Sequence, residues 1–240
     1  MKRMFFVILA RPENPDNIGL IARAMKNTGF SDLRLTQVPG LDSLSYKTAV
    51  HAGDILDQAR LYPTLAEAVA DLELVFAATA KTRKNFSSLN LGDAVEKIFS
   101  FPASTKIGLL FGNERTGLTS EELRNSNFRF AIPQASRQPS YNLASAVLLT
   151  LFHIFAYPLP KKKKAFEKPL PRRGQETVIR LILKKLEAKR FVHRTNKAHV
   201  EDMVRDLFGR LTLTEKDQSL LLALFSKGVD IQAHEKERRT

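Results

Sequence analysis

The chain has 240 residues, 43% hydrophobic and 26% charged, which is enough to bury a sizeable core in one or two domains. It contains no cysteine, and this excludes disulfide scaffolds, thiolate metal sites and a cysteine nucleophile. Its net charge of +13 favours a polyanionic partner such as nucleic acid, although a basic surface that only keeps the protein in solution would account for it too.

Short apolar runs alternate with helical patterns over the first 157 residues. Strands are expected at 4–10, 33–38, 73–80, 107–112 and 128–133, and helices near 18–28, 64–71 and 140–157. This alternation predicts an α/β domain with a mostly parallel sheet. The first run lacks a small-residue cleavage site, so we interpret it as a buried strand and not a signal peptide. No run is long enough to span a bilayer, and we expect no membrane association.

The next segment, residues 158–174, places four prolines among basic residues, which predicts an extended and exposed linker. Beyond it, three apolar patterns at helical spacing predict a small all-helical extension over residues 175–240. Residues 1–157 contain 17 basic and 14 acidic side chains, against 21 and 11 in residues 158–240. We therefore expect the linker and extension to bind nucleic-acid phosphates, the alternatives being that they keep the protein in solution or clamp a dimer.

Two common site types have no support in the sequence. The first strand is not followed by a glycine-rich turn, and there is no P-loop, which disfavours a nucleotide-dependent oxidoreductase of the ordinary doubly wound type. The five histidines are scattered without the spacing of metal ligands, so we expect no metal site.

Three segments do end predicted strands in glycine and polar residues. They read NPDNIGLIAR (14–23), LLFGNERTGLTSEEL (109–123) and IPQASRQPSYNLASAV (132–147). In the second, Thr119 and Glu122 form a capping box that predicts the start of a helix. Because ligands bind at the carboxyl ends of parallel strands, we expect the three segments to build one site.

Together and in this order, the segments resemble the three motifs of the TrmH-like branch of the SPOUT superfamily of RNA methyltransferases. The matching residues are Asn14, Pro15, Asn17, Gly19 and Arg23; Phe111, Gly112, Glu114, Gly117 and Leu118; and Ile132, Pro133, Ser140, Tyr141 and Asn142. The layout is most similar to the TrmJ-like group, which methylates the ribose 2'-hydroxyl of nucleotide 32 in the tRNA anticodon loop. The resemblance implies a C-terminal trefoil knot within residues 1–157, S-adenosylmethionine as cofactor, a cytoplasmic homodimer and tRNA as partner.

The resemblance also implies a role for the arginine of the first motif, Arg23, which acts on the hydroxyl that receives the methyl group. Since a guanidinium is a poor proton acceptor, we expect Arg23 to stabilise the developing alkoxide and to anchor the adjacent phosphate, the alternative being a solvated surface arginine. The other expected catalytic residues are Asn17, Glu114, Ser140 and Asn142. The expected cofactor-binding residues are Ala78, Thr79, Ala80, Gly112, Ile132, Ser140, Tyr141 and Asn142. The expected RNA-binding residues are Arg23, Lys81, Arg83, Arg115, Lys161, Lys162, Arg172 and Arg173.

Two further alternatives stay open at this point. The substrate could be ribosomal RNA instead of tRNA. The chain could also be a catalytically silent RNA-binding protein on the same scaffold, although Arg23, Glu114 and Asn142 are all present.

Overall fold

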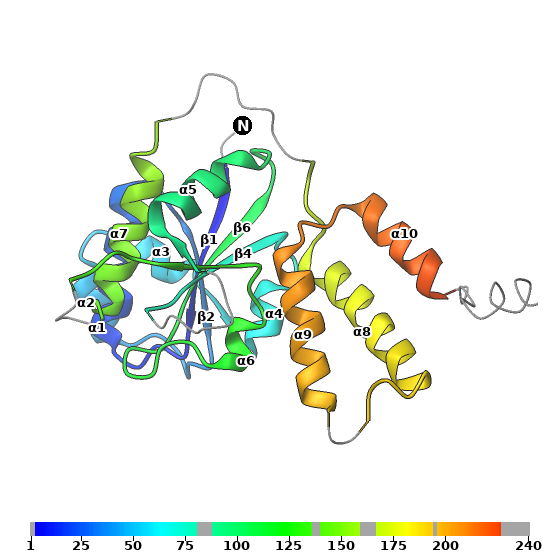
Figure 1. Ribbon diagram of the computed structural model, residues 1–240. Helices are drawn as coiled ribbons and strands as arrows, with labels where there is room; N and C mark the ends of the chain where they lie inside the picture. The colour runs from blue at the N-terminus through cyan, green and yellow to red at the C-terminus, as the bar shows by residue number, and fades with distance from the viewer. Residues whose placement is uncertain (1–2, 81–87, 136–139, 159–166, 194–195, 227–240) are drawn as a thin grey trace, which may run out of the picture.

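A computed structural model describes residues 3–80, 88–135, 140–158, 167–193 and 196–226. The strands are β1 (Met4–Ala10), β2 (Asp32–Thr36), β3 (Arg60–Tyr62), β4 (Leu74–Ala78), β5 (Leu89–Asn90), β6 (Lys106–Phe111) and β7 (Phe128–Ala131). The helices are α1 (Pro15–Thr28), α2 (Ser43–Ala49), α3 (Gly53–Asp57), α4 (Leu65–Val69), α5 (Leu91–Ser100), α6 (Ser120–Leu123), α7 (Leu143–Phe155), α8 (Arg172–Ala188), α9 (Lys197–Arg210) and α10 (Glu215–Ser226). The strands form one sheet (Figure 1). Their order is β3-β2-β1-β6-β4-β7-β5, and every pair is parallel. The predicted α/β class is therefore confirmed.

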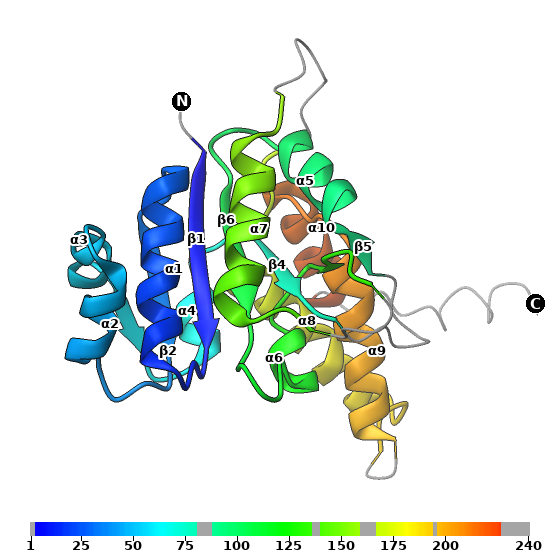
Figure 2. The same cartoon turned by 90° about the vertical axis from the view of Figure 1, so that its left-hand side faces the viewer.

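Helices cover both faces of this sheet, because side chains alternate between the faces along each strand. In β1, Val7 and Leu9 belong to the apolar cluster that includes α1, α2, α3, α5 and α7. Phe6 and Ile8 belong to a second cluster with α4 and α6. On the first face, α1 and α7 run alongside each other (Figure 2). Burial on both sides explains why the central strands have almost continuous apolar sequences.

Local signals fix the ends of α1 and so place the first motif at the carboxyl edge of the sheet. The side chain of Asn14 accepts a hydrogen bond from the backbone N–H of Asp16 at 2.9 Å, and Pro15 occupies the first turn. The helix ends at Gly29, whose φ of 77° is the left-handed conformation that glycine adopts most easily. The turn between β1 and α1, residues 11–14, therefore leads directly into the helix.

Five elements, β3, β5, α2, α3 and α5, were not expected from the sequence. Of these, α5 has the clearest signal in retrospect, with Asn90 as its cap and Leu91, Ala94, Val95 and Ile98 buried at helical spacing. The others have two to seven residues, too few for a periodicity to stand out. They lie outside the site, and their omission did not alter the predicted class.

Residues 158–174 were predicted to be an exposed linker, but the last residues of this segment are neither extended nor fully exposed. Leu170 is buried, and α8 begins at Arg172, before the expected boundary. The backbone N–H of Leu170 donates to the carbonyl of Leu213, and that of Arg172 donates to the carbonyl of Leu72. The end of this segment therefore packs on the sheet domain, because apolar and hydrogen-bonding partners are available there.

The C-terminal helices α8, α9 and α10 form a unit on the side of the sheet where α4 and α6 pack (Figure 1). The three predicted apolar patterns meet in one buried cluster. Its buried members are Leu170, Val178, Ile179, Ile182, Phe208 and Leu213. No helix in the described part of the chain has the length and apolar character that crossing a membrane requires.

One glutamine joins this unit to the sheet domain. Gln175 is 1% exposed, and its Nε2 donates to the carbonyl oxygens of Leu170 at 2.8 Å and Glu73 at 3.4 Å. Its Oε1 accepts from Asn127 Nδ2 and from Arg172 Nη1, both at 3.2 Å. All the hydrogen-bonding capacity of the buried amide is thereby used, as a buried polar group requires.

Candidate functional site

A cavity of about 400 Å³ opens at the carboxyl ends of β4, β6 and β7. Residues after all three strands line it: Ala78, Thr79, Ala80, Phe111, Gly112, Asn113, Glu114, Arg115, Thr116, Gly117, Leu118, Ile132, Gln134, Ser140, Tyr141, Leu143 and Ala146. The structure thus brings together every residue expected at the cofactor except Asn142, which lies beside the cavity and not in its wall. The size lies within the range of small-molecule sites.

The loop between β6 and α6, residues 112–118, forms one wall of the cavity and folds back tightly on itself. A Cβ added to Gly112 would lie 2.4 Å from the backbone of both Gly117 and Leu118, and Gly117 has a φ of 66°. The backbone N–H of Gly117 donates to the carbonyl of Asn113 at 2.9 Å. Gly112 was expected to bind the cofactor, but the return of the loop alone already requires glycine there.

A chain of hydrogen bonds links the three motifs across the edge of the sheet. Asn142 Nδ2 donates to Asn17 Oδ1, and Asn17 Nδ2 donates to Glu114 Oε1, each at 3.0 Å. Asn142 also caps α7 by accepting from the backbone N–H of Ala144 at 2.9 Å. Residues far apart in sequence are therefore held in one arrangement beside the cavity.

Glu114 is ionised in this arrangement. Partial burial raises the pKa of its carboxyl, but hydrogen bonds from the backbone N–H of Glu13 and from Asn17 and Asn14 outweigh burial and hold the pKa below its ordinary value. A carboxylate stabilised in this way is a poor base at neutral pH. Glu114, which was expected among the catalytic residues, is therefore placed to orient its neighbours and not to accept a proton.

Arg23 lies apart from the cavity. Its side chain is exposed on α1, six residues after Asn17 and so about 9 Å further along the helix axis. Among the residues that the structure describes, none forms a hydrogen bond or ion pair with the Arg23 side chain. Within one copy of the chain, Arg23 therefore does not line the cavity.

The expected RNA-binding residues have different environments. Arg115 lines the cavity and forms an ion pair with Glu13, with Nε 2.8 Å from Oε2 and its side chain 78% exposed. Arg173 is exposed at the start of α8. Lys81, Arg83, Lys161 and Lys162 lie outside the described residues.

Arg172 does not fit the RNA-binding role expected of it. Its guanidinium is buried, donating through Nη2 to the carbonyl of Arg124 at 2.9 Å and through Nη1 to Gln175. Burial lowers the pKa of Arg172 to about 10, so the group stays charged at neutral pH. The basic, proline-rich sequence around it predicted exposure, whereas the side chain is enclosed at the junction of the C-terminal unit with the sheet domain.

Large apolar side chains are exposed on the face where α1 and α7 lie. Phe152 and Phe155 of α7 are 55% and 62% exposed, Leu148 lies one turn before Phe152, and Leu20 is exposed on α1 one turn before Arg23. No described segment of the same copy covers these side chains. In the described part of the molecule, no group of three acidic or histidine side chains could hold a metal ion.

Sequence reasoning missed three residues that hold the site or its surroundings in place. Arg11 and Glu122 form an ion pair behind the loop 112–118, and Gln175 joins the C-terminal unit to the sheet domain. The capping box gave a partial signal for Glu122, since its side chain does accept from the backbone N–H of Thr119. Nothing in the sequence indicates its second partner.

Most of the chain is similar in sequence to known proteins. Residues 4–152 match the model of the SpoU rRNA Methylase family. The chain is 35% identical over 153 residues to the uncharacterized tRNA/rRNA methyltransferase LasT of Escherichia coli, covering 62% of this chain and 66% of LasT. It is 30% identical over 215 residues to the tRNA (cytidine-2'-O-)-methyltransferase TrmJ of Methanocaldococcus jannaschii, covering 87% of this chain and 90% of that one.

Solved structures resemble the fold to different extents. TrmJ from Z. mobilis ZM4 superposes with a TM-score of 0.81 at 28% identity, covering 92% of this chain and 97% of that chain. A structure described as giving insight into 2-OH methylation of C/U34 on tRNA has a TM-score of 0.52 at 26% identity and covers 64% and 95%. AviRb from Streptomyces viridochromogenes, in complex with AdoMet, shares the fold at 21% identity and a TM-score of 0.51, covering 65% and 58%.

Proposed function

Since this chain belongs to the SpoU rRNA methylase family and is an S-adenosylmethionine-dependent methyltransferase of SPOUT fold, we propose that it methylates the ribose 2'-hydroxyl of nucleotide 32 in the tRNA anticodon loop. The observation that carries the tRNA assignment is the extent of the likeness to TrmJ proteins. It includes the C-terminal helices, whereas the likeness to the C/U34 protein covers only 64% of this chain. Nucleotide 32 is the position that the motif resemblance implies.

The residues of the cavity fit the cofactor. The apolar side chains of Ala78, Ile132 and Leu143 offer walls for an adenine ring, and the backbone of residues 112–118 offers polar groups for the ribose and the amino acid part. When bound, S-adenosylmethionine supplies a methyl group on a sulfonium that is already a good leaving group. The protein's remaining task is to hold the ribose hydroxyl in line with that methyl group.

The acceptor side is assigned to the first motif. Asn17 and Glu114 fix the start of α1, and Arg23 projects from the same helix with no competing partner among the described residues. Because its guanidinium is always charged, Arg23 stabilises the negative charge that develops on the 2'-oxygen and binds the neighbouring phosphate. The proton leaves to phosphate or water, because neither a guanidinium nor the stabilised Glu114 carboxylate accepts it readily.

We further propose that two copies of the chain form a homodimer through the exposed face of α1 and α7. Leu148, Phe152 and Phe155 would be covered there, and Leu20 would join them from α1. Arg23 lies on the same side of α1 as Leu20, so this contact would place Arg23 at the interface, where we propose that it reaches the cavity of the other copy. The distance of Arg23 from its own cavity supports this arrangement, and the cytoplasm, where tRNA occurs, is its expected location.

Methylation mapping tests the substrate. Total RNA from cells with and without the gene is digested and analysed by mass spectrometry, and the purified protein is then given tRNA transcripts carrying a 2'-deoxynucleotide at position 32 or at position 34. We expect loss of one tRNA methylation in the mutant cells and no transfer to the 32-deoxy transcript, with the 34-deoxy transcript as the matched control. Loss of a ribosomal RNA methylation would instead favour the alternative substrate, and no change in any RNA would favour a silent binding protein.

Mixed dimers test the shared site. Arg23→Ala removes the arginine that acts on the ribose hydroxyl. Ala80→Trp places a large side chain in the cofactor cavity, because Ala80 is an exposed residue of the cavity wall. Neither variant alone is expected to transfer methyl groups. If Arg23 acts on the other copy's cavity, mixed dimers contain one intact composite site and regain activity; an inactive mixture would contradict the proposal.

A further inference from the structure

The loop 112–118 has few apolar contacts that could fix its shape. It contributes seven residues to the wall of the cavity yet packs only its end, at Leu118, into an apolar cluster. Its conformation therefore depends on polar contacts with other segments. Glu114 and Arg115 line the cavity and contact Glu13, in the turn after β1. A second set of contacts comes from Arg11, which follows β1 and does not line the cavity.

Arg11 has an unusual backbone conformation. Its φ of 54° is left-handed, which is uncommon for a residue with a side chain. The conformation lets its backbone N–H donate to the carbonyl of Thr36 at 3.1 Å while its own carbonyl accepts from Asn113 Nδ2 at 2.9 Å. Backbone strain of this kind persists only where the surroundings hold it, and it is concentrated at functional sites.

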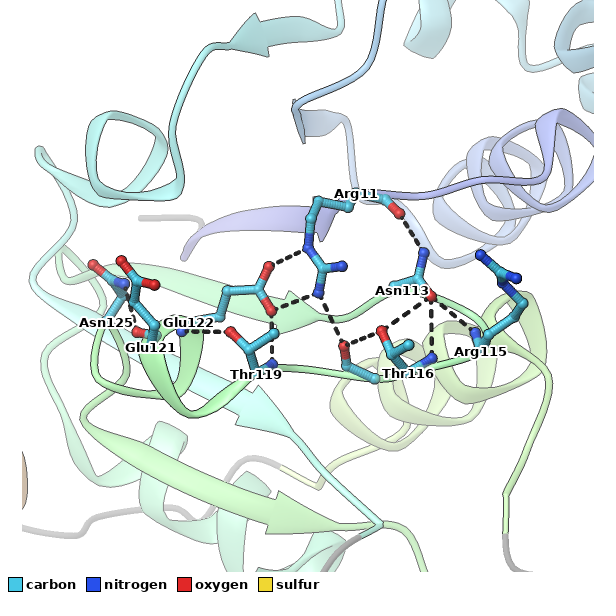
Figure 3. A network of polar contacts seen from close by, with 9 residues as sticks. Arg11, Asn113, Arg115, Thr116, Thr119, Glu121, Glu122 and Asn125 are labelled. Atoms are coloured by element: carbon cyan, nitrogen blue, oxygen red, sulfur yellow. Dashed lines mark hydrogen bonds and ion pairs between the residues drawn. The ribbon is translucent and has the colours of Figure 1, made fainter.

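Asn113 passes this restraint to the first half of the loop (Figure 3). With its Nδ2 directed to Arg11, its Oδ1 accepts hydrogen bonds from the backbone N–H of Arg115 at 3.0 Å and of Thr116 at 3.1 Å. It also accepts from the hydroxyl of Thr116 at 3.2 Å. The carbonyl of Arg11 therefore fixes the orientation of an amide that in turn fixes the backbone of residues 113–116.

The guanidinium of Arg11 holds the second half of the loop. Nε donates to Glu122 Oε1 at 2.6 Å and Nη2 donates to Oε2 at 2.8 Å, a paired geometry that a lysine could not reproduce. Nη2 also lies 3.3 Å from the carbonyl oxygen of Gly117. Glu122 itself accepts from the backbone N–H of Thr119 at 2.7 Å, so the start of α6 belongs to the same network (Figure 3).

We propose that Arg11, with Glu122, is a positioning residue that sets the affinity for S-adenosylmethionine by holding the loop 112–118 in its cofactor-binding shape; this rests on the cofactor assignment made above. Neither side chain lines the cavity. They act through Asn113, Gly117 and the backbone between them. Loss of the restraint allows the loop to adopt other shapes, and the cofactor must then select the binding-competent one, which weakens its apparent affinity.

The test measures S-adenosylmethionine and S-adenosylhomocysteine binding by calorimetry on full-length variants, with thermal unfolding in parallel. Arg11→Gly is the main variant, since glycine tolerates the left-handed backbone and so removes the side chain without adding strain. We expect the dissociation constant for both ligands to rise about tenfold or more, the effect typical of losing a residue that supports a ligand-binding group. Glu122→Gln should raise it less, and Arg11→Lys should restore part of the affinity that Arg11→Gly removes.

Kinetics separate positioning from general weakening of the fold. The KM for S-adenosylmethionine should rise in Arg11→Gly, whereas kcat at saturating cofactor and the KM for tRNA should stay within about twofold, because only the population of the binding-competent loop has changed. The control is Arg205→Gln, which breaks a similar paired contact between Arg205 and Glu176 in the C-terminal helices. It should lower the melting temperature without altering cofactor affinity.

Cofactor affinity within twofold of the unaltered protein in both Arg11→Gly and Glu122→Gln would overturn the proposal. So would an equal loss of affinity in Arg205→Gln, because the effect would then follow stability alone. If the unaltered protein binds no S-adenosylmethionine, the cofactor assignment itself fails, and the positioning role falls with it.

Discussion

The carboxyl edge of the sheet and the junction of the C-terminal helices are both held by polar side chains, but they use them differently. At the junction, Gln175 is 1% exposed and all its hydrogen bonds go to protein groups. At the edge, Glu114 is only partly buried, and the loop that carries it borders a cavity. A buried polar group whose hydrogen bonds all go to protein groups indicates that it attaches one part of the fold to another. Ordered polar groups around an open cavity indicate ligand binding.

The largest effect is expected at Arg23, which belongs to neither region within one copy of the chain. Arg23→Ala should lower the single-turnover methyl-transfer rate by about a hundredfold or more, the typical effect of losing a preorganised electrostatic contact, while cofactor affinity stays nearly unchanged. Rapid-quench assays with calorimetry on the same samples measure both. Near-normal turnover in Arg23→Ala would show that methyl transfer at the edge of the sheet does not depend on Arg23.

A smaller effect, on stability and not on binding, is expected at the junction. Gln175→Leu leaves Asn127, Arg172 and two carbonyl groups without their partner, which should lower the free energy of unfolding by about 2 kcal/mol. Thr177→Val, on an exposed position of the same helix, is the control and should change it little. Urea unfolding measures the difference. A marked change in cofactor affinity in Gln175→Leu would mean that the two regions are not independent.

The C-terminal unit is expected to hold RNA through phosphate contacts, and charge reversal tests this without cutting the chain. Arg173 and Lys184 are exposed on α8, and Lys189 is exposed at its C-terminal end. The triple variant Arg173→Glu, Lys184→Glu and Lys189→Glu should weaken tRNA binding about tenfold and lower its salt dependence, by roughly 0.7 to 0.9 log units of slope for each phosphate that is no longer neutralised. Cofactor affinity should not change. Lys47→Glu, exposed on α2, serves as the control. An unaltered salt slope would favour a role of the unit in dimer formation.

The smallest expected effect is a pH dependence at Glu122. Burial raises the pKa of this carboxyl, but Arg11 and the backbone N–H of Thr119 outweigh it, and the pKa lies below its ordinary value of 4.5. The ion pair therefore stabilises the fold above about pH 4.5, and this contribution is lost as the pH falls through the lower pKa of the folded state. Urea unfolding should show the protein more stable than Glu122→Gln at pH 7 and the difference shrinking toward pH 3. A constant difference would contradict this assignment.

Much of the fold could be predicted because the signals were local. The five expected strands are present, since an apolar run bounded by polar turns is the direct consequence of a strand buried on both faces. The three motifs could be recognised as one site because the carboxyl ends of parallel strands share an edge. The trefoil knot has no such local signal, and it could be expected only from the resemblance of the motifs.

The contacts that hold the site could not be predicted from the sequence, because they join distant residues. Asn17 and Glu114 are 97 residues apart, Asn142 and Asn17 are 125 apart, and Arg11 and Glu122 are 111 apart. The resemblance identified Asn17, Glu114 and Asn142 but not their order in the hydrogen-bonded chain. Arg11 and Glu122 have no motif, and only the folded arrangement brings them together.

The position of β1 near the middle of the sheet has a consequence for how the chain folds as it is synthesised. On one side β1 pairs with β2, which follows within about thirty residues, but on the other side Met4 to Leu9 pair with Lys106 to Phe111 of β6. Until β6 has left the ribosome, one edge of an entirely apolar strand stays open to pairing with other chains. We therefore expect nascent chains or fragments that stop before residue 106 to aggregate, and folding to be slow for a protein of this size because its central pairing closes a long loop.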